Sequence, residues 1–215
     1  MRIADEVVVA TDSDEIADAV RSAGGRAVLT KADHPSGTDR VAEVAAFPAY
    51  AGHDTIVNVQ GDEPFIAESA IRGAIAMVCE ARFPLGTAAV RADTSILGME
   101  SVVKVVCADD GRALYFSRAS IPYLRDQADA RELGRLVRQH VGIYAYSRRG
   151  LAEWVGLPSH PLERVERLEQ LRPLAAGMAM GVATIDEPLH GGVDTEDDLT
   201  RANALWDDLY AGRTR

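Results

Sequence analysis

Two apolar, β-branched runs place the strongest constraint on the fold of this chain. Residues 6–12 read EVVVATD and residues 54–60 read DTIVNVQ. Long apolar stretches of this kind are typical of parallel strands that are buried on both faces. A helical pattern lies between the two runs, with Ser13 placed to cap a helix and Gly24-Gly25 placed to end it. The alternation of strand and helix predicts a doubly wound, mostly parallel α/β sheet.

The middle of the chain has a different pattern. Residues 102–107 and 112–117 flank an Asp-Asp-Gly turn and are typical of an antiparallel hairpin. Residues 139–147, QHVGIYAYS, predict a further strand with aromatic side chains at alternate positions. We therefore expect a single domain over residues 1–215, with a hairpin region inserted at about residues 100–150.

Two helices are expected after the hairpin region. Residues 160–177 show a helical pattern rich in Glu-Arg pairs, which Pro173 should kink or end. The second helix begins near Thr195, which is placed to form a capping box with Asp198 three residues later.

The composition limits the partners and the location of the chain. Of its 215 residues 47% are hydrophobic, its formal net charge is -10 and its sequence pI is about 5.0. An acidic surface disfavours nonspecific binding to nucleic acid, and no apolar run approaches the ~20 residues of a membrane span. We expect a cytoplasmic protein that binds neither nucleic acid nor membranes. Any anionic substrate would need local positive groups or a metal.

Several enzyme classes are disfavoured because their motifs are missing from the sequence. It contains no G-x-x-x-x-G-K-[ST] loop, no dinucleotide-binding fingerprint, no G-x-S-x-G element and no Cys/His metal cluster. These absences argue against a P-loop enzyme, a dehydrogenase and an α/β-hydrolase.

Two carboxylates are candidate metal ligands. Asp62 follows the apolar run in Gln60-Gly61-Asp62-Glu63-Pro64, which places it beyond the carboxyl end of a strand, where ligands of open α/β sheets bind. Asp194 stands just before the Thr195 cap, so helix capping does not explain it. Two such carboxylates are suited to hold Mg²⁺ beside substrate phosphates. The alternative is a strand-ending turn whose acids are merely solvated.

The remaining polar candidates each have a structural alternative. The loop of residues 33–40, DHPSGTDR, offers backbone amides for an anion or a base edge, but it is also an ordinary helix cap. Arg118 at a strand end could bind a carboxylate or phosphate in a fork, or form a surface salt bridge. A lone His140 is more often structural than catalytic. Glu169 and Gln170 lie in the predicted helix, where solvated i,i+4 partners are the default.

Taken together, these segments resemble one family. The strings TKADHPSGTDRVAEV, IVNVQGDEPFI, YFSRASIPY, HVGIYAYS, LERVERLEQLR and HGGVDTEDDL occur in the order expected of the 3-deoxy-manno-octulosonate cytidylyltransferases, over nearly the whole chain. The resemblance implies a Rossmann-like nucleotidyltransferase fold and the coupling of CTP to 3-deoxy-manno-octulosonate (Kdo), with release of pyrophosphate. It also implies Mg²⁺ dependence, a homodimer and a role in lipopolysaccharide synthesis.

The same resemblance implies roles for individual residues. Asp62 and Asp194 would hold Mg²⁺ and, with Arg118, carry catalysis. The residues that would face the cytidine or the sugar are Gln60, Ser36, Gly37, Thr38, Asp39 and Arg40. The residues that would surround Kdo are Gln60, Arg118, His140, Tyr144, Glu169 and Gln170.

The chain departs from the family pattern at its start. The family begins with a strand and a Gly/Arg/Lys-containing loop that embraces the triphosphate, whereas this chain starts at what would be the second strand. We therefore expect unpaired strand edges inside the sheet. Two alternatives stay open: a fragment that does not bind CTP normally, or an enzyme for another acidic sugar, such as an acylneuraminate or an amino analogue of Kdo.

Overall fold

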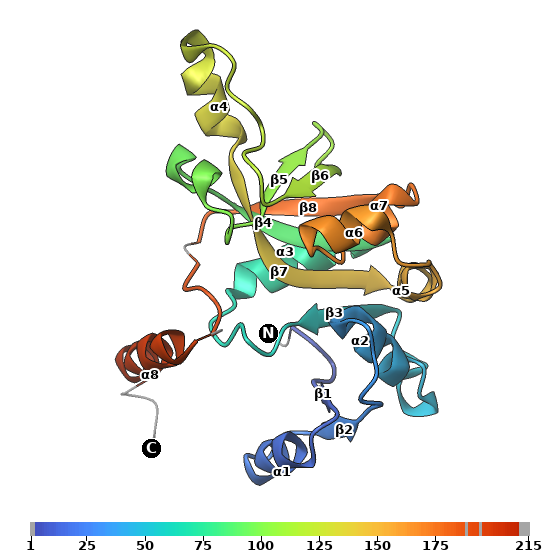
Figure 1. Ribbon diagram of the computed structural model, residues 1–215. Helices are drawn as coiled ribbons and strands as arrows, with labels where there is room; N and C mark the ends of the chain where they lie inside the picture. Colours follow the sequence, from blue (N-terminus) through green and yellow to red (C-terminus); the bar gives the residue numbers. More distant parts are fainter. Residues whose placement is uncertain (1–2, 188, 194, 211–215) are drawn as a thin grey trace.

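The computed structural model describes residues 3–187, 189–193 and 195–210, and its centre is a six-stranded sheet. The strand order is β6-β5-β7-β4-β8, and β3 pairs with the C-terminal half of β7 (Figure 1). The strands are β3 (Thr55–Val59), β4 (Leu85–Arg91), β5 (Lys104–Cys107), β6 (Ala113–Ser117), β7 (Arg138–Ser147) and β8 (Met180–Ile185).

Strand directions confirm the predicted α/β fold class. β7 is antiparallel to β3, β4 and β5, and β8 is parallel to β4. It follows that β3, β4, β5 and β8 share one direction, while β6 and β7 run the opposite way. The sheet is thus mostly parallel in strand direction, with antiparallel strands inserted.

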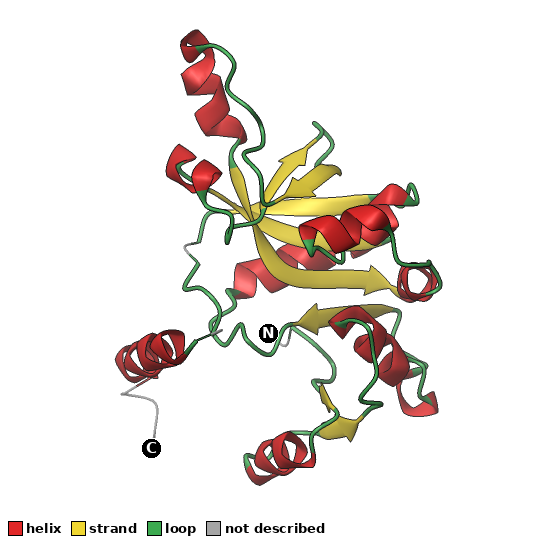
Figure 2. Ribbon diagram, viewed as in Figure 1, coloured by secondary structure: helices red, strands yellow, loops and turns green. Residues whose placement is uncertain are grey.

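Helices cover both faces of this sheet (Figures 1 and 2). On one face α3 (Glu68–Cys79) buries Ala70 and Ala74, and Gly86 allows close approach because a Cβ there would lie 2.3 Å from the Ala74 carbonyl oxygen. On the other face α2 (Gly37–Ala45) and α5 (Arg148–Val155) enclose a core around Trp154 and Tyr146. The aromatic positions predicted in β7 therefore face one layer only.

A second, two-stranded sheet lies apart from the first. The parallel strands β1 (Val9–Thr11) and β2 (Ala27–Leu29) are joined by α1 (Asp14–Ser22), whose predicted Ser13 cap is confirmed by a bond from Ile16 N to Ser13 Oγ. β1 is shorter than expected. Among the described residues, β1 pairs only with β2 and β3 only with β7. The expected open edges are present, and Val9 and Val59 are exposed there.

The hairpin region agrees with its prediction. β5 and β6 pair antiparallel around the expected turn. Short helical turns lie before the hairpin at η2 (Thr94–Gly98) and after it at η3 (Gln127–Asp129), and a further one, η1 (Pro48–Tyr50), lies between α2 and β3. The short helix α4 (Ala130–Leu136) projects from the top of the molecule in Figure 1.

The helix predicted over residues 160–177 is wrong in one respect. It is divided into α6 (Pro161–Glu166) and α7 (Leu171–Ala175), and the break falls at Arg167 rather than at Pro173. Arg167 has a left-handed backbone with φ of 56°, which ends the first helix. Pro173 lies within the first turn of α7, where its missing N–H costs nothing. The break creates the short link 167–170.

The last helix, α8 (Glu196–Tyr210), lies to the side of the sheet in Figure 1. Its predicted capping box is confirmed, because Asp198 N donates to Thr195 Oγ1 and Thr195 N donates to Asp198 Oδ2. The rings of Phe65 and Trp206 lie 6.3 Å apart and connect α8 to the segment before α3. No helix in the described ranges is long and apolar enough to cross a membrane.

Candidate active site

The turn after β3 is the first part of the candidate site. Glu63 N donates to the Gln60 carbonyl oxygen at 3.2 Å and closes the turn. The Gln60 side chain lies over β7, because a Cβ on Gly142 would be 3.5 Å from Gln60 Oε1. Asp62 is exposed beyond the strand end, as its sequence position predicts. Its carboxylate is therefore open to a ligand.

The predicted second carboxylate, Asp194, lies outside the described residues. The segment before it is in contact with the turn, since Val193 N donates to the Asp62 carbonyl oxygen at 2.8 Å. No group of three His, Cys, Asp or Glu side chains suited to a metal occurs in residues 3–187, 189–193 and 195–210. Mg²⁺ often takes only one or two protein carboxylates together with substrate phosphates. Hard carboxylate oxygens at a strand end fit such an ion.

The SGTDR loop forms the start of α2. Ser36 caps this helix, with its hydroxyl accepting from Asp39 N and donating to Asp39 Oδ2 at 2.6 Å. Arg40 points away toward the small sheet, where it donates to Thr30 Oγ1 at 2.6 Å and pairs with Asp12 at 3.3 Å. The helix-cap interpretation of Ser36 is thus confirmed. Binding of a ligand by residues 36–40 stays a prediction.

Thr38 and β7 build a buried wall beside the turn. The Thr38 and Tyr146 hydroxyl oxygens lie 3.0 Å apart, and Asn58 Nδ2 donates to Tyr146 Oη at 3.5 Å. The Tyr144 hydroxyl donates to Gln170 Oε1 at 3.0 Å. We call Thr38, Asn58, Tyr144, Tyr146, Glu169 and Gln170 the polar wall. It joins α2, β3, β7 and the α6–α7 link.

Burial sets the protonation of this wall. It raises the pKa of Tyr144 and of Tyr146 well above the usual tyrosine range, so both hydroxyls keep their protons. Burial also raises the pKa of Glu169, an effect that nearby Ser36 and Thr38 only partly offset. Glu169 Oε2 is buried and has no hydrogen-bond partner within the described part of the chain. An acceptor of this kind favours a ligand that brings a hydroxyl donor.

The expected solvated positions of Glu169 and Gln170 are therefore wrong. Arg167 ends α6 one residue before Leu168, which turns the link inward and leaves Gln170 2% exposed. Behind the link, buried Arg172 donates to Glu163 Oε1 at 2.6 Å and lies 3.8 Å from Asp39. This ion pair fixes α7 against α6 and α2.

His140 lies next to the wall. Its ring packs edge-on against Phe116 at 4.9 Å and tilts against Tyr144 at 5.6 Å. Nε2 is 2.9 Å from the buried hydroxyl of Thr87. Burial lowers the pKa of His140 to about 3, so the ring is neutral at physiological pH.

Arg118 is held by backbone rather than by a surface salt bridge. Its Nε donates to the Glu166 carbonyl oxygen at 3.1 Å and its Nη1 to that of Glu100 at 3.1 Å. The adjacent Lys104 is fully buried and donates to the carbonyl oxygens of Met99, Val102 and Arg118. This connection places Arg118 between the hairpin and α6.

Several residues of the site are not among those that the sequence predicts. Asn58 was visible as a polar residue inside an apolar run, and Tyr146 as one of the alternate aromatics, but their bonding was not foreseen. Thr87, Lys104 and Arg172 are buried polar residues whose burial no sequence motif marks.

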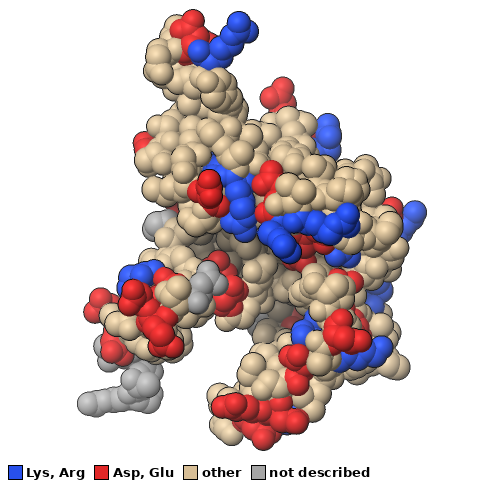
Figure 3. Space-filling view, viewed as in Figure 1, with Lys and Arg blue, Asp and Glu red and all other residues tan. Residues whose placement is uncertain are grey.

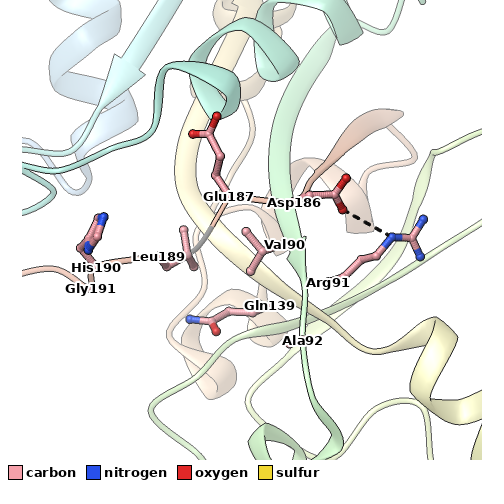
Figure 4. A pocket seen from close by; sticks show the side chains of 9 residues that line it. All are labelled: Val90, Arg91, Ala92, Gln139, Asp186, Glu187, Leu189, His190 and Gly191. Carbon is pink, nitrogen blue, oxygen red and sulfur yellow. Dashed lines mark ion pairs between the residues drawn. The ribbon is translucent and has the colours of Figure 1, made fainter.

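Figure 4 shows a separate open pocket beyond β4 and β8, with a volume of about 590 Å³. Arg91 and Asp186 form an ion pair of 3.8 Å there, beside Gln139, Glu187 and His190. None of the predicted site residues lines it. On the face drawn in Figure 3, acidic side chains gather over α1 and α8, and basic side chains over α6 and the centre.

A doubly wound sheet with a carboxylate beyond a strand end and a polar wall beside it has the arrangement in which open α/β enzymes bind their ligands. The family profile described as cytidylyltransferase matches residues 2–180. The chain belongs to the cytidylyltransferase family.

Relatives with one specific name share this sequence and fold. The chain is 57% identical over 212 residues to the 3-deoxy-manno-octulosonate cytidylyltransferase of Gemmatimonas aurantiaca, covering 99% of this chain and 82% of the relative. It is 42% identical over 205 residues to that of Legionella pneumophila strain Corby, covering 94% and 80%. A solved CMP:2-keto-3-deoxy-manno-octonic acid synthetase in complex with CTP matches with a TM-score of 0.85 and 36% identity, covering 95% and 81%.

Proposed function

We propose that this chain transfers the cytidylyl group of CTP to Kdo and releases pyrophosphate, in the synthesis of lipopolysaccharide. The observation that carries the proposal is the polar wall, where Glu169 Oε2 is a buried acceptor that lacks a donor among the described residues. A sugar acid brings several hydroxyl donors. The names of the relatives supply CTP and Kdo as the substrates.

The reaction is an in-line displacement. The anomeric hydroxyl of Kdo attacks the α-phosphorus of CTP and forms the new P–O bond, its proton passes to solvent, and pyrophosphate leaves with the electrons of the broken P–O bond. Such a transfer depends on positioning and on neutralising charge, so no protein nucleophile is required. Tyr144 and Gln170 orient the sugar, and Arg118, held between the hairpin and α6, supplies a cation for its carboxylate.

Asp62 and Asp194 would hold Mg²⁺. When bound, the ion neutralises negative charge on the triphosphate. The exposed carboxylate of Asp62 supports this assignment, because it stands at the strand end with no competing ion pair within the described residues.

We propose a cytoplasmic homodimer. The projecting α4 and the hairpin supply apolar side chains for a partner copy, since Leu114 is 52% and Leu136 is 48% exposed. Exposed apolar side chains of this kind are suited to a subunit contact.

A second candidate function is a protein that binds the sugar but not CTP normally. The open edges of β1 and β3 favour it, because they interrupt the sheet beside the turn that carries Asp62. Calorimetric titration of the chain with CTP and Mg²⁺ separates the two functions, since saturable CTP binding rules out the second.

The deciding experiment is pyrophosphate release with CTP, Kdo and Mg²⁺, omitting each in turn. Release that requires all three supports the cytidylyltransferase. Competition among Kdo, an amino analogue of Kdo and an acylneuraminate then identifies the preferred sugar. No release from any sugar, with calorimetry showing no CTP binding, overturns the proposed function.

A further inference from the structure

The pairing register of β4 and β7 shifts between Thr87 and Ala88, one position from the pair of Ala89 with His140. Thr87 pairs with Tyr144, but the next residue, Ala88, pairs with Val141. Two residues of β7, Gly142 and Ile143, are therefore left without a partner in β4. A bulge of this kind takes backbone groups out of the regular ladder and re-aims the neighbouring side chains.

The Thr87 hydroxyl occupies this bulge. It is fully buried and donates to the Ile143 carbonyl oxygen at 2.6 Å, with the Val141 carbonyl oxygen farther away at 3.4 Å. The same hydroxyl oxygen lies 2.9 Å from His140 Nε2. One side chain thus satisfies the bulge and contacts the imidazole.

The number of protons decides the tautomer of His140. A hydroxyl has a single proton, and a carbonyl oxygen can only accept. If the Thr87 proton pointed to His140, lone pairs on Thr87 Oγ1 and on the Ile143 carbonyl oxygen would face and repel each other at 2.6 Å. The Thr87 proton therefore lies on the Ile143 side, and His140 Nε2 must donate to Thr87. Nε2 carries the proton and Nδ1 is an acceptor.

We propose that Thr87 is a positioning residue that holds His140 in its Nε2–H tautomer and so presents Nδ1 as a hydrogen-bond acceptor to a hydroxyl of the acidic sugar. This inference rests on the proposed function for the identity of the sugar. The tautomer itself follows from the geometry of Thr87 alone.

The surroundings of His140 support an acceptor role. Nδ1 has no hydrogen-bond partner in the part of the chain that the structure describes. It is also not one of the fully buried polar atoms, so a ligand can reach it. The ring is held by Phe116 and Tyr144, so it cannot turn freely. Because burial keeps the ring neutral, it cannot serve as a cation for the sugar carboxylate. Gln60 and Gly142 lie at the same bulge, which places another predicted sugar ligand nearby.

The tautomer is tested by long-range ¹H–¹⁵N NMR on the full chain labelled with ¹⁵N-histidine, with His140 assigned through a His140→Gln variant. The chain has five histidines, so this assignment is practical. We expect a pyrrole-type Nε2 and a pyridine-type Nδ1 that do not titrate between about pH 5 and pH 8. A protonated Nδ1 overturns the inference. Added Kdo should shift Nδ1 and leave Nε2 protonated; an unchanged Nδ1 signal at saturating Kdo also overturns it.

Variants of Thr87 connect the tautomer to binding. Thr87→Val removes the acceptor for Nε2–H, and we expect the KM for Kdo to rise about tenfold with the KM for CTP unchanged, the size of one neutral hydrogen bond. Thr87→Ser should restore both the NMR pattern and the KM. Thr55→Val, a strand threonine at the far end of the β3–β7 pair, is the matched control and should change neither.

Failure of the proposed function and failure of the Thr87 positioning role give different results. A correct tautomer in a chain that releases no pyrophosphate overturns the proposed function alone. An active enzyme in which Thr87→Val keeps the wild-type KM for Kdo overturns the positioning role alone.

Discussion

Tyr144 and Gln170 lie buried in hydrogen bonds that join separate elements, whereas Asp62 lies exposed in a turn at the end of one strand. The polar wall is fixed before any ligand arrives, because moving one member breaks a bond to another segment. Within the described residues, the turn is tied to the segment before α8 by the bond from Val193 N to the Asp62 carbonyl oxygen, and the Asp62 side chain is exposed. Under the proposed function, the difference means that the wall is preorganised for the sugar, whereas the turn is completed by the ion and phosphates that it binds.

The largest expected effect is on the exposed side. Asp62→Asn removes one ligand charge for Mg²⁺, and we expect turnover to fall on the order of a thousandfold, since the ion stabilises charge in the transition state. Stability should change by less than about 0.5 kcal/mol, because the side chain is exposed. Pyrophosphate release and urea denaturation measure the two effects. Asp109→Asn, an exposed acid in the hairpin turn, is the control and should leave turnover intact. Turnover equal to that of the wild type would remove Asp62 from the site.

The next effect is on the stability of the buried side. Arg172→Leu leaves the Glu163 carboxylate without its partner at 2.6 Å, and we expect the free energy of unfolding to fall by about 3 kcal/mol. Urea denaturation measures the loss, and Glu163→Gln added to Arg172→Leu should recover part of it. The exposed pair of Arg135 with Glu132 is the control, because Arg135→Leu should cost less than about 0.5 kcal/mol. Equal losses in the two variants would contradict a preorganised wall.

A smaller effect is expected inside the wall. Tyr146→Phe removes the hydroxyl that lies 3.0 Å from Thr38 Oγ1 and accepts from Asn58. We expect a loss of about 1 kcal/mol in the free energy of unfolding, the usual value for a buried neutral hydrogen bond. Tyr123→Phe, at a tyrosine that is 81% exposed, should leave stability unchanged. A Tyr146→Phe variant as stable as the wild type would show that the wall is not bonded as described.

The same contrast explains what sequence could predict. The caps at Ser13 and Thr195, the hairpin and the position of Asp62 depend on neighbours within a few residues, so local pattern was sufficient. For Glu169 and Gln170 the helical pattern alone favours solvated partners, and only the family resemblance implies sugar binding. No residue type near Arg167 signals its left-handed backbone, which is usually a position for glycine. Thr87 depends on the Ile143 carbonyl oxygen, and Lys104 in part on that of Arg118, which the tertiary fold brings to them. The sequence therefore predicts the position of the exposed Asp62 turn, but it predicts the buried polar wall only in part.

The smallest expected effect is a change in pH dependence at Glu169. Burial raises the folded-state pKa of this carboxyl above its ordinary value of 4.5. As pH rises from that value, the unfolded chain loses this proton before the folded chain does, so the group's contribution to stability decreases until the folded pKa is passed. Glu169→Gln has no proton to lose. Its stability relative to the wild type should therefore increase with pH over this window and then stay constant.

Urea denaturation of the two proteins between about pH 4 and pH 8 measures this difference. Subtracting one curve from the other cancels carboxylates such as Glu163, whose pKa is lowered and whose effect has the opposite sign. Glu132→Gln, on the exposed surface of α4, is the control and should give a flat difference. A flat difference for Glu169→Gln as well would mean that this carboxyl is as well solvated as Asp62, and the contrast between the two sides of the site would not hold there.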